Sequence, residues 1–173
     1  HDQVEAMTMG DKIAILKDGV IHQVADPITL YDYPVNKFVA GFIGTPPMNF
    51  MECRVIKKEG AIYLDEGSYE VKVSKGMEKV LEPHLGKEVI FGIRPEDIYD
   101  KLYSAGATRD NTISAIVEVV EPMGAEILLH MTTGRSSFIA RVGSHNKAKV
   151  HQDIEMVFDM DKIHIFDKET EKA

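Results

Sequence analysis

The sequence predicts a mainly β protein in which a short α/β segment precedes a small barrel or sandwich of strands. Two observations support this fold class. After Pro47, apolar residues alternate with polar ones in short runs, and glycine-containing turns separate most of these runs. Before that point, the sequence Thr45-Pro46-Pro47 divides the chain, because paired prolines fix φ and exclude helix. We therefore expect one region at residues 1–44 and another at residues 45–173.

Length and charge restrict the class of protein. The chain has 173 residues, of which 44% are hydrophobic, so it can bury a core in one domain or in one domain with an appendage. Its 28 acidic and 20 basic residues give a net charge of −8. This balance disfavours nucleic acid and anionic membrane surfaces as main partners, because both require clustered Lys and Arg.

Cysteine usage and hydropathy suggest a compartment. The single cysteine, Cys53, cannot form an internal disulfide and fits a reducing environment. The sequence has no run of about 18 apolar residues and no charged-then-apolar signal segment. We therefore expect a soluble protein that is not exported by that route.

The first 44 residues contain signals for three short helices and one hairpin. Asp2 and Glu5 resemble a capping box that opens a helix ending near Gly10. Apolar runs on either side of Asp18-Gly19 predict a β-hairpin. Two more helices are expected, one opening at Asp26-Pro27 and one opening at Asn36 and closing at Gly44.

Beyond Pro47 the period-two pattern predicts eight or nine short strands. One helix interrupts them, with Ser74 as its N-cap and Pro83 and Gly86 ending it. Closely spaced strands with glycine turns are typical of a small barrel or sandwich. The expected strands lie at residues 51–56, 62–64, 69–73, 88–93, 113–119, 125–131, 138–142, 154–158 and 163–165.

The stretch FGIRPEDI, residues 91–98, is predicted to end a strand in a fixed corner around which the other strands are arranged. Phe91 and Ile93 alternate with Gly92, which predicts one apolar face, and Pro95 ends ladder pairing because it has no N–H to donate. Arg94 and Glu96 are interpreted as a charged pair that closes this corner, in preference to a ligand site.

Catalytic patterns are nearly absent from this sequence. It has no phosphate-binding glycine loop followed by Lys and Ser or Thr, no nucleophile elbow and no HExxH helix. Its seven histidines are scattered, and His145 and His151 straddle a loop without Cys or paired carboxylates at ligand spacing, so no metal site is expected. The carboxylate pairs Asp65-Glu66 and Glu96-Asp97 fall in turns, where they are expected to cap or to be solvated.

Several motifs in order resemble a known family. The opening HDQVEAM and the later KDGVI resemble the end of an ABC transporter ATPase from its switch-histidine loop onward. The stretches NKFVAGFIG, PPMNF and FGIRPEDI, followed by VEPMGAE and HIFD, are similar to the bacterial sugar-importer branch of the maltose and glycerol-phosphate type, with its C-terminal TOBE regulatory domain.

The resemblance implies an OB-like TOBE β-barrel at residues 45–173 after a remnant of the nucleotide-binding domain at residues 1–44. It implies that His1 is the switch histidine, which contacts the terminal phosphate of ATP and is functional only in a full-length parent. The phosphate-binding motifs and the magnesium-binding carboxylates would lie upstream, so the chain by itself is expected to need no cofactor and to be no enzyme, while the parent uses ATP and magnesium. Implied partners are a second copy through the regulatory domain, the permease subunits on the inner face of the cell membrane, and a regulatory protein.

Two other functions are known for domains with an OB-like fold. An oxyanion-binding module of the molybdate type would require converging N–H groups and cationic side chains, for which Lys75, Lys147 and Lys149 are the only candidates. An OB fold that binds single-stranded nucleic acid would require a basic groove with exposed aromatic residues. The acidic balance of the chain and the core phasing of Tyr63, Tyr69 and Phe138 disfavour this second function. The sequence does not indicate which solute the parent transports.

Overall fold

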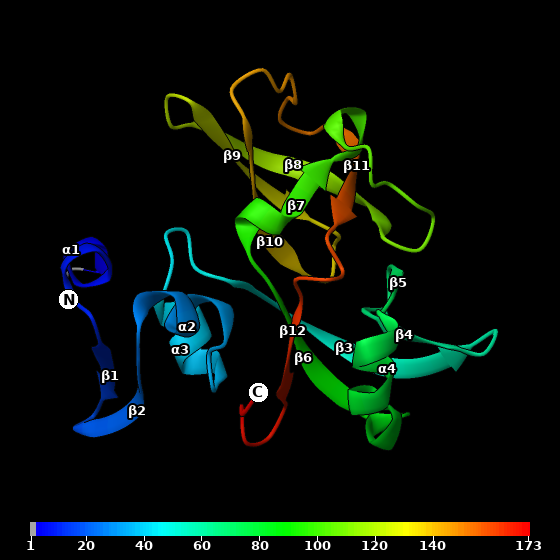
Figure 1. Ribbon diagram of the computed structural model, residues 1–173. Helices are drawn as coiled ribbons and strands as arrows, with labels where there is room; N and C mark the ends of the chain where they lie inside the picture. Colours follow the sequence, from blue (N-terminus) through cyan, green and yellow to red (C-terminus); the bar gives the residue numbers. More distant parts are fainter. Residues whose placement is uncertain (1–2) are drawn as a thin grey trace. The chain divides into compact units, whose positions relative to one another are not determined.

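The computed structural model describes residues 3–173 and divides the chain into two compact units (Figure 1). Unit 1 consists of the chain up to Met48 together with residues 166–173, and unit 2 consists of residues 49–165. The chain thus returns to unit 1 at its C-terminal end, which the sequence pattern did not indicate. None of the helices among residues 3–173 is both long and apolar enough to span a membrane.

Unit 1 contains the three helices and the hairpin that the sequence predicts. Asp26 and Asn36 cap their helices, because their side chains accept hydrogen bonds from the N–H groups of Thr29 and Val39. Asp18, at φ 52°, and the glycine after it, at φ 77°, form the tight hairpin turn. The elements are α1 (Gln3–Met9), β1 (Ile13–Lys17), β2 (Val20–Ala25), α2 (Pro27–Asp32) and α3 (Lys37–Phe42).

Unit 1 has its own small core and a C-terminal strap. Ile15, Leu30, Val39 and Ile43 form its cluster of buried side chains. Residues 166–173 are joined to the segment before α3 and to the start of that helix by backbone hydrogen bonds. The N–H of Lys37 donates to the carbonyl of Glu171 over 2.9 Å, and the N–H of Ala173 donates to the carbonyl of Val35 over 3.0 Å.

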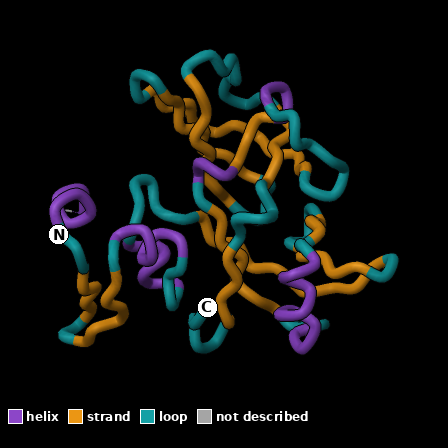
Figure 2. Tube along the Cα trace, viewed as in Figure 1, coloured by secondary structure: helices purple, strands orange, loops and turns teal. Residues whose placement is uncertain are grey.

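Two five-stranded sheets account for the strands after Pro47, and all of their strands lie in unit 2 except that β12 ends in residues of unit 1. Every strand pair with a recorded register in these sheets is antiparallel (Figures 1 and 2). We name them by their central strands. The β3 sheet has the order β12 (His164–Asp167), β6 (Glu88–Ile93), β3 (Asn49–Lys58), β4 (Ala61–Asp65) and β5 (Glu70–Lys72). The β8 sheet has the order β10 (Ser137–Gly143), β9 (Glu126–Thr132), β8 (Thr112–Pro122), β11 (Asp153–Phe158) and β7 (Ile98–Asp100).

The mainly β fold is confirmed, but the number of strands after Pro47 was underestimated. Ten strands follow Pro47 in the described residues, and the one that the pattern missed is β7. This strand has only three residues and comes directly after the 3-10 turn Pro95–Asp97, so it is too short for a period-two pattern. The structure therefore has the predicted corner, and directly after it the chain enters the second sheet.

The predicted helix is α4 (Lys75–Leu81), followed by the 3-10 turn Glu82–His84. Ser74 caps it, with its Oγ accepting from the N–H of Met77 over 3.4 Å. Leu81 is fully buried and joins the core of unit 2. Because this helix follows the short edge strand β5, it covers the adjacent end of the β3 sheet.

Both sheets of unit 2 share one hydrophobic core. Phe158 of β11 lies at its centre, with ring centroids 5.8 Å from Phe91 of β6, 5.8 Å from Tyr69 and 5.7 Å from Phe138 of β10. The prediction that β6 has a single apolar face was incomplete, because Ile90 is only 5% exposed and Gly92 is also buried. Both faces of β6 are therefore covered. The β8 sheet itself is nearly closed into a barrel, because its two edge strands, β10 and β7, lie in contact.

Candidate functional site

The sites suggested by the sequence do not come together in the structure. His1 lies outside the described residues. Lys75 begins α4 beside the β3 sheet, whereas Lys147 and Lys149 are exposed in the connection before β11 of the other sheet. None of these three lysines lines the pocket between β3 and the β9–β10 turn that is described below. The oxyanion site that they suggested is therefore not supported by their placement.

The corner at residues 94–97 buries a carboxylate next to the predicted pair of Arg94 and Glu96. Arg94 is 2% exposed and Asp97 is 8% exposed, while Glu96 is only partly buried. Burial raises the pKa of Asp97 to about 6, although the ammonium group of Lys162, 3.7 Å away, opposes the shift. The pairing of Arg94 with Glu96 stays a prediction, whereas the burial of Asp97 was not expected, because burial cannot be read from the sequence of a turn.

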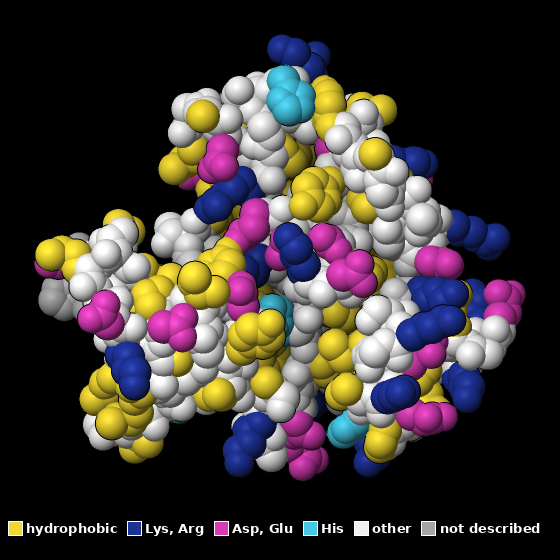
Figure 3. All heavy atoms as spheres, in the orientation of Figure 1, with side chains coloured by type: hydrophobic (Ala, Val, Ile, Leu, Met, Phe, Trp, Pro, Cys, Tyr) yellow, Lys and Arg dark blue, Asp and Glu magenta, His cyan; other side chains and the backbone are white. Residues whose placement is uncertain are grey.

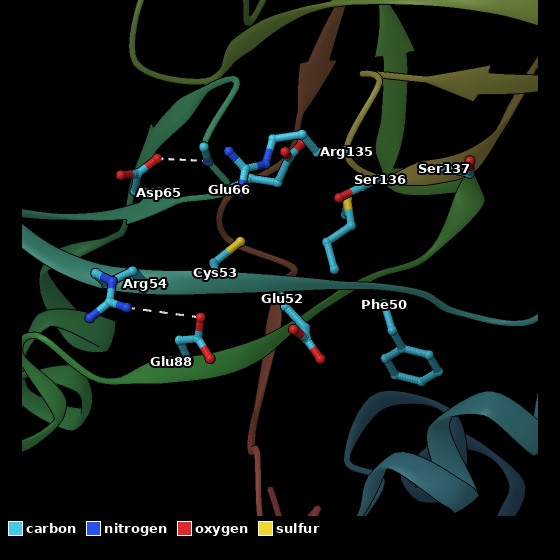
Figure 4. A pocket seen from close by; sticks show the side chains of 12 residues that line it. Phe50, Glu52, Cys53, Arg54, Asp65, Glu66, Glu88, Arg135, Ser136 and Ser137 are labelled. Atoms are coloured by element: carbon cyan, nitrogen blue, oxygen red, sulfur yellow. Dashed lines mark hydrogen bonds and ion pairs between the residues drawn. The ribbon is translucent and has the colours of Figure 1, made fainter.

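A pocket with a volume of about 560 Å³ lies within unit 2. It is bordered by β3, by the β4–β5 turn and by the start of β10, so both sheets contribute to it (Figure 4). Two of its side chains, Asp65 and Glu66, were expected from the sequence to cap or to be solvated. Asp65 does cap the turn, since its Oδ1 accepts from the N–H of Gly67 over 2.8 Å.

Glu66 instead forms the fixed base of the pocket. It is only 6% exposed, and its two carboxylate oxygens accept hydrogen bonds from the hydroxyl of Ser68 over 3.0 and 3.1 Å. A third bond comes from the hydroxyl of Thr133, over 2.7 Å, in the β9–β10 turn of the other sheet. Hydrogen bonds to the ionised form offset the cost of burying a charge, so this carboxylate joins two turns that are distant in sequence.

The Thr133 hydroxyl also orders its own turn. It accepts hydrogen bonds from the N–H groups of Arg135, over 3.3 Å, and Ser136, over 3.1 Å. The backbone of Arg135 is therefore constrained, and the guanidinium group of its side chain lies directly over Gly67. A Cβ at Gly67, where φ is 108°, would come within 2.5 Å of Nη1 of Arg135, so this approach requires a residue without a side chain.

An ion pair and a buried thiol complete the β3 side of the pocket. Nη1 of Arg54 donates to the carbonyl of Gly86 over 2.7 Å, and its Nη2 lies 3.9 Å from the carboxylate of Glu88 (Figure 4). Cys53 is 2% exposed, and burial raises the pKa of its thiol far above neutral pH. Because a thiol must be ionised to act as a nucleophile, this cysteine is a packing residue.

The lining of the pocket is polar and carries both signs of charge. It offers carboxylate acceptors and guanidinium and hydroxyl donors. Among residues 3–173, no group of three His, Cys, Asp or Glu side chains is placed to hold a metal ion. Figure 3 shows Lys and Arg side chains interspersed with Asp and Glu over the face that it presents. This mixture matches pairs such as Lys58–Glu70, at 3.0 Å, and differs from the basic groove that nucleic acid requires.

The sequence alone does not predict this pocket. Thr133-Gly134-Arg135 lies in the hairpin turn between β9 and β10, and nothing local to it signals a partner at Glu66 in another turn. A carboxylate in one turn and a Thr-Gly-Arg turn in a later hairpin are each common. Only the packing of the two sheets around their shared core brings these two turns together.

Comparison with known proteins places these features in two adjoining families. Residues 44–98 match the MalK OB fold domain, and residues 91–166 match the TOBE domain. The two matches overlap at residues 91–98, which is the stretch where the chain passes from β6 of the first sheet to β7 of the second.

Curated relatives match the whole chain. The chain is 45% identical over 176 residues to the trehalose/maltose import ATP-binding protein MalK of Thermococcus litoralis, which covers all of the chain and 46% of that protein. It is 42% identical over 173 residues to the oligosaccharides import ATP-binding protein MsmX of Bacillus subtilis, which covers 99% of the chain and 46% of that protein. The chain thus spans just under half the length of these relatives.

A solved structure supports the fold alone. The cytoplasmic molybdate-binding protein ModG, with molybdate bound, superposes with a TM-score of 0.53 at 14% identity. The match covers 68% of this chain and 94% of that one. At this identity the similarity concerns the arrangement of strands and carries no ligand.

Proposed function

This chain belongs to the family of sugar-import ABC transporter ATP-binding subunits that carry the MalK OB fold and TOBE domains, and we propose that it forms the C-terminal regulatory region of such a subunit. The observation that carries the proposal is the succession of the two domain matches across residues 44–166, together with 45% identity over the whole chain to a trehalose/maltose import protein. The transported solute would then be a sugar or oligosaccharide.

In this proposal the subunit couples ATP hydrolysis to solute import, and ATP and magnesium bind to the part that precedes this chain. The sequence contains no phosphate-binding glycine loop, so the chain alone is not expected to hydrolyse ATP. His1 would be the switch histidine beside the terminal phosphate. Unit 1 would complete the nucleotide-binding domain, and unit 2 would be the regulatory domain.

The proposed partners follow from this role. Permease subunits would hold the protein at the inner face of the cell membrane. A second copy would associate through the regulatory domain, and a regulatory protein could bind there. Sedimentation of the chain at tens of micromolar tests the second copy, because an interface of standard size assembles in that range. A monomer at all concentrations would contradict self-association of this region.

A chimaera tests the proposed function. The part of the T. litoralis relative that precedes its match to this chain is joined to residues 1–173 and combined with that relative's permease partners. We expect ATP hydrolysis and sugar uptake that depend on each other. The matched control lacks residues 49–165. Absence of uptake by a folded chimaera that binds ATP would contradict the proposal.

A further inference from the structure

We propose that the pocket between β3 and the β9–β10 turn binds a neutral polyhydroxylated molecule, such as a monosaccharide or disaccharide. Its volume of about 560 Å³ lies in the range typical of small-molecule sites, roughly 300–1,000 Å³. The pocket lies wholly within unit 2, so it is complete in this chain.

The charges of the lining favour a neutral ligand. Four carboxylates and two guanidinium groups border the pocket, which leaves a formal charge of −2. The carboxylates of Asp65 and Glu66 would repel an anion. The guanidinium of Arg135, which lies over Gly67 in the β4–β5 turn, would repel a compact cation. A neutral ligand with many hydroxyls is repelled by neither.

The lining also contains donors that the protein leaves available. Within residues 3–173, the guanidinium of Arg135 and the hydroxyls of Ser136 and Ser137 make no hydrogen bond or ion pair. Carboxylate oxygens of Asp65 and Glu88 lie in the same lining and can accept further bonds (Figure 4). Each sugar hydroxyl both donates and accepts, so it can bond to a donor and an acceptor of this mixed lining.

The pocket is held open before any ligand arrives. The bond from Thr133 to Glu66 fixes the distance between the two turns, and the missing side chain at Gly67 lets Arg135 lie flat across the β4–β5 turn. A preformed site loses less conformational entropy on binding than one assembled from mobile loops. This favours measurable affinity for a small ligand despite the polar lining.

The inference rests on the proposed function for its biological sense. If the chain is the regulatory region of a sugar importer, this pocket faces the compartment that receives the imported solute. Occupancy would then report the concentration of free sugar to the regulatory domain, and the transporter could be slowed when the solute accumulates.

The test is a titration of the 173-residue chain followed by amide NMR. Maltose, trehalose and glucose are added separately to about 50 mM, and we expect at least one to cause saturable shifts at Gly67, Arg135 and Ser136 with a Kd of about 0.1–10 mM. Arg135→Ala should weaken binding at least tenfold. Lys147→Ala removes an exposed cation outside the pocket and should leave binding unchanged.

Three results would overturn the inference. These are the absence of saturable shifts with every sugar, undiminished binding by Arg135→Ala, and saturable shifts at these residues with sodium phosphate or spermidine but not with sugars. If Arg135→Ala reduces cooperativity of unfolding, Ser137→Ala serves as the second variant, and it should weaken binding without altering unfolding. The chimaera assay does not depend on this pocket, so uptake without sugar binding would remove only this inference.

Discussion

The side chain of Asn49 pairs with the backbone of Ile139 as a neighbouring strand would. Its Nδ2 donates to the carbonyl of Ile139 over 2.9 Å, and its Oδ1 accepts from the N–H of Ile139 over 2.8 Å. Asn49 begins β3 and is 8% exposed, and Ile139 lies in β10. The side-chain amide of Asn49 therefore connects one strand of each sheet. This pair links the central strand of the β3 sheet to an edge strand of the β8 sheet.

Replacing this amide should destabilise unit 2. Asn49→Leu leaves the N–H and carbonyl of Ile139 buried without a partner, so we expect the free energy of unfolding to fall by about 2–4 kcal/mol. Urea denaturation followed by circular dichroism measures the change. Ser114→Ala is the control, because it removes a hydrogen bond of 2.9 Å to Asp153 that is exposed to solvent. A loss below about 0.5 kcal/mol for Asn49→Leu would show that water replaces the amide.

Substitutions at Glu66 and at Thr133 should have coupled effects on the free energy of unfolding. Thr133→Val keeps the shape of the side chain but removes the hydroxyl that donates to Glu66, so a loss of about 1–3 kcal/mol is expected. A double-mutant cycle with Glu66→Gln separates the direct bond from other effects. If the two substitutions are additive, the bond does not hold the turns together and the pocket is not preorganised by it.

Asp97 should make stability depend on pH. Its pKa rises from 3.8 to about 6 on folding, so its contribution is fully present below pH 3.8 and is lost as pH rises through about 6. The shift corresponds to at most about 3 kcal/mol, which we reduce to about 1–2 kcal/mol because Lys162 and solvent screen the carboxylate. Above pH 7, Asp97→Asn should therefore stabilise the protein by that amount.

The measurement is urea denaturation of the Asp97→Asn variant and the original chain at pH 5 and pH 8. The difference between the two proteins should be larger at pH 8, since the original chain then buries a charge. Glu118→Gln changes an exposed carboxylate and serves as the control. A difference that is equal at both pH values would contradict the raised pKa of Asp97.

His1 is a prediction that only the full-length subunit can test. If it is the switch histidine, His1→Ala should lower ATP turnover by a factor on the order of a hundred or more, while ATP affinity changes far less, because a transition-state contact is lost. In the 173-residue chain the same change should alter stability by at most about 0.5 kcal/mol. Unchanged turnover, or a large loss of stability in the chain, would show that the assignment is wrong.

The local elements could be read from the sequence because neighbouring residues determine them. Asp26, Asn36 and Ser74 cap helices within three residues of themselves, and Asp18-Gly19 makes its hairpin through its own φ angles. The ordered motifs of residues 91–98 and their surroundings were likewise sufficient for the family, which the domain matches confirm.

Only the tertiary structure decided how these elements combine. Asn49 and Ile139, and Glu66 and Thr133, are pairs whose members are 90 and 67 residues apart, and neither member of a pair carries a local sign of the other. The short strand β7 and the return of residues 166–173 to unit 1 also depend on partners distant in sequence. Period-two patterns specify which face of a strand is buried, but the choice of neighbouring strand is made when the core around Phe158 closes.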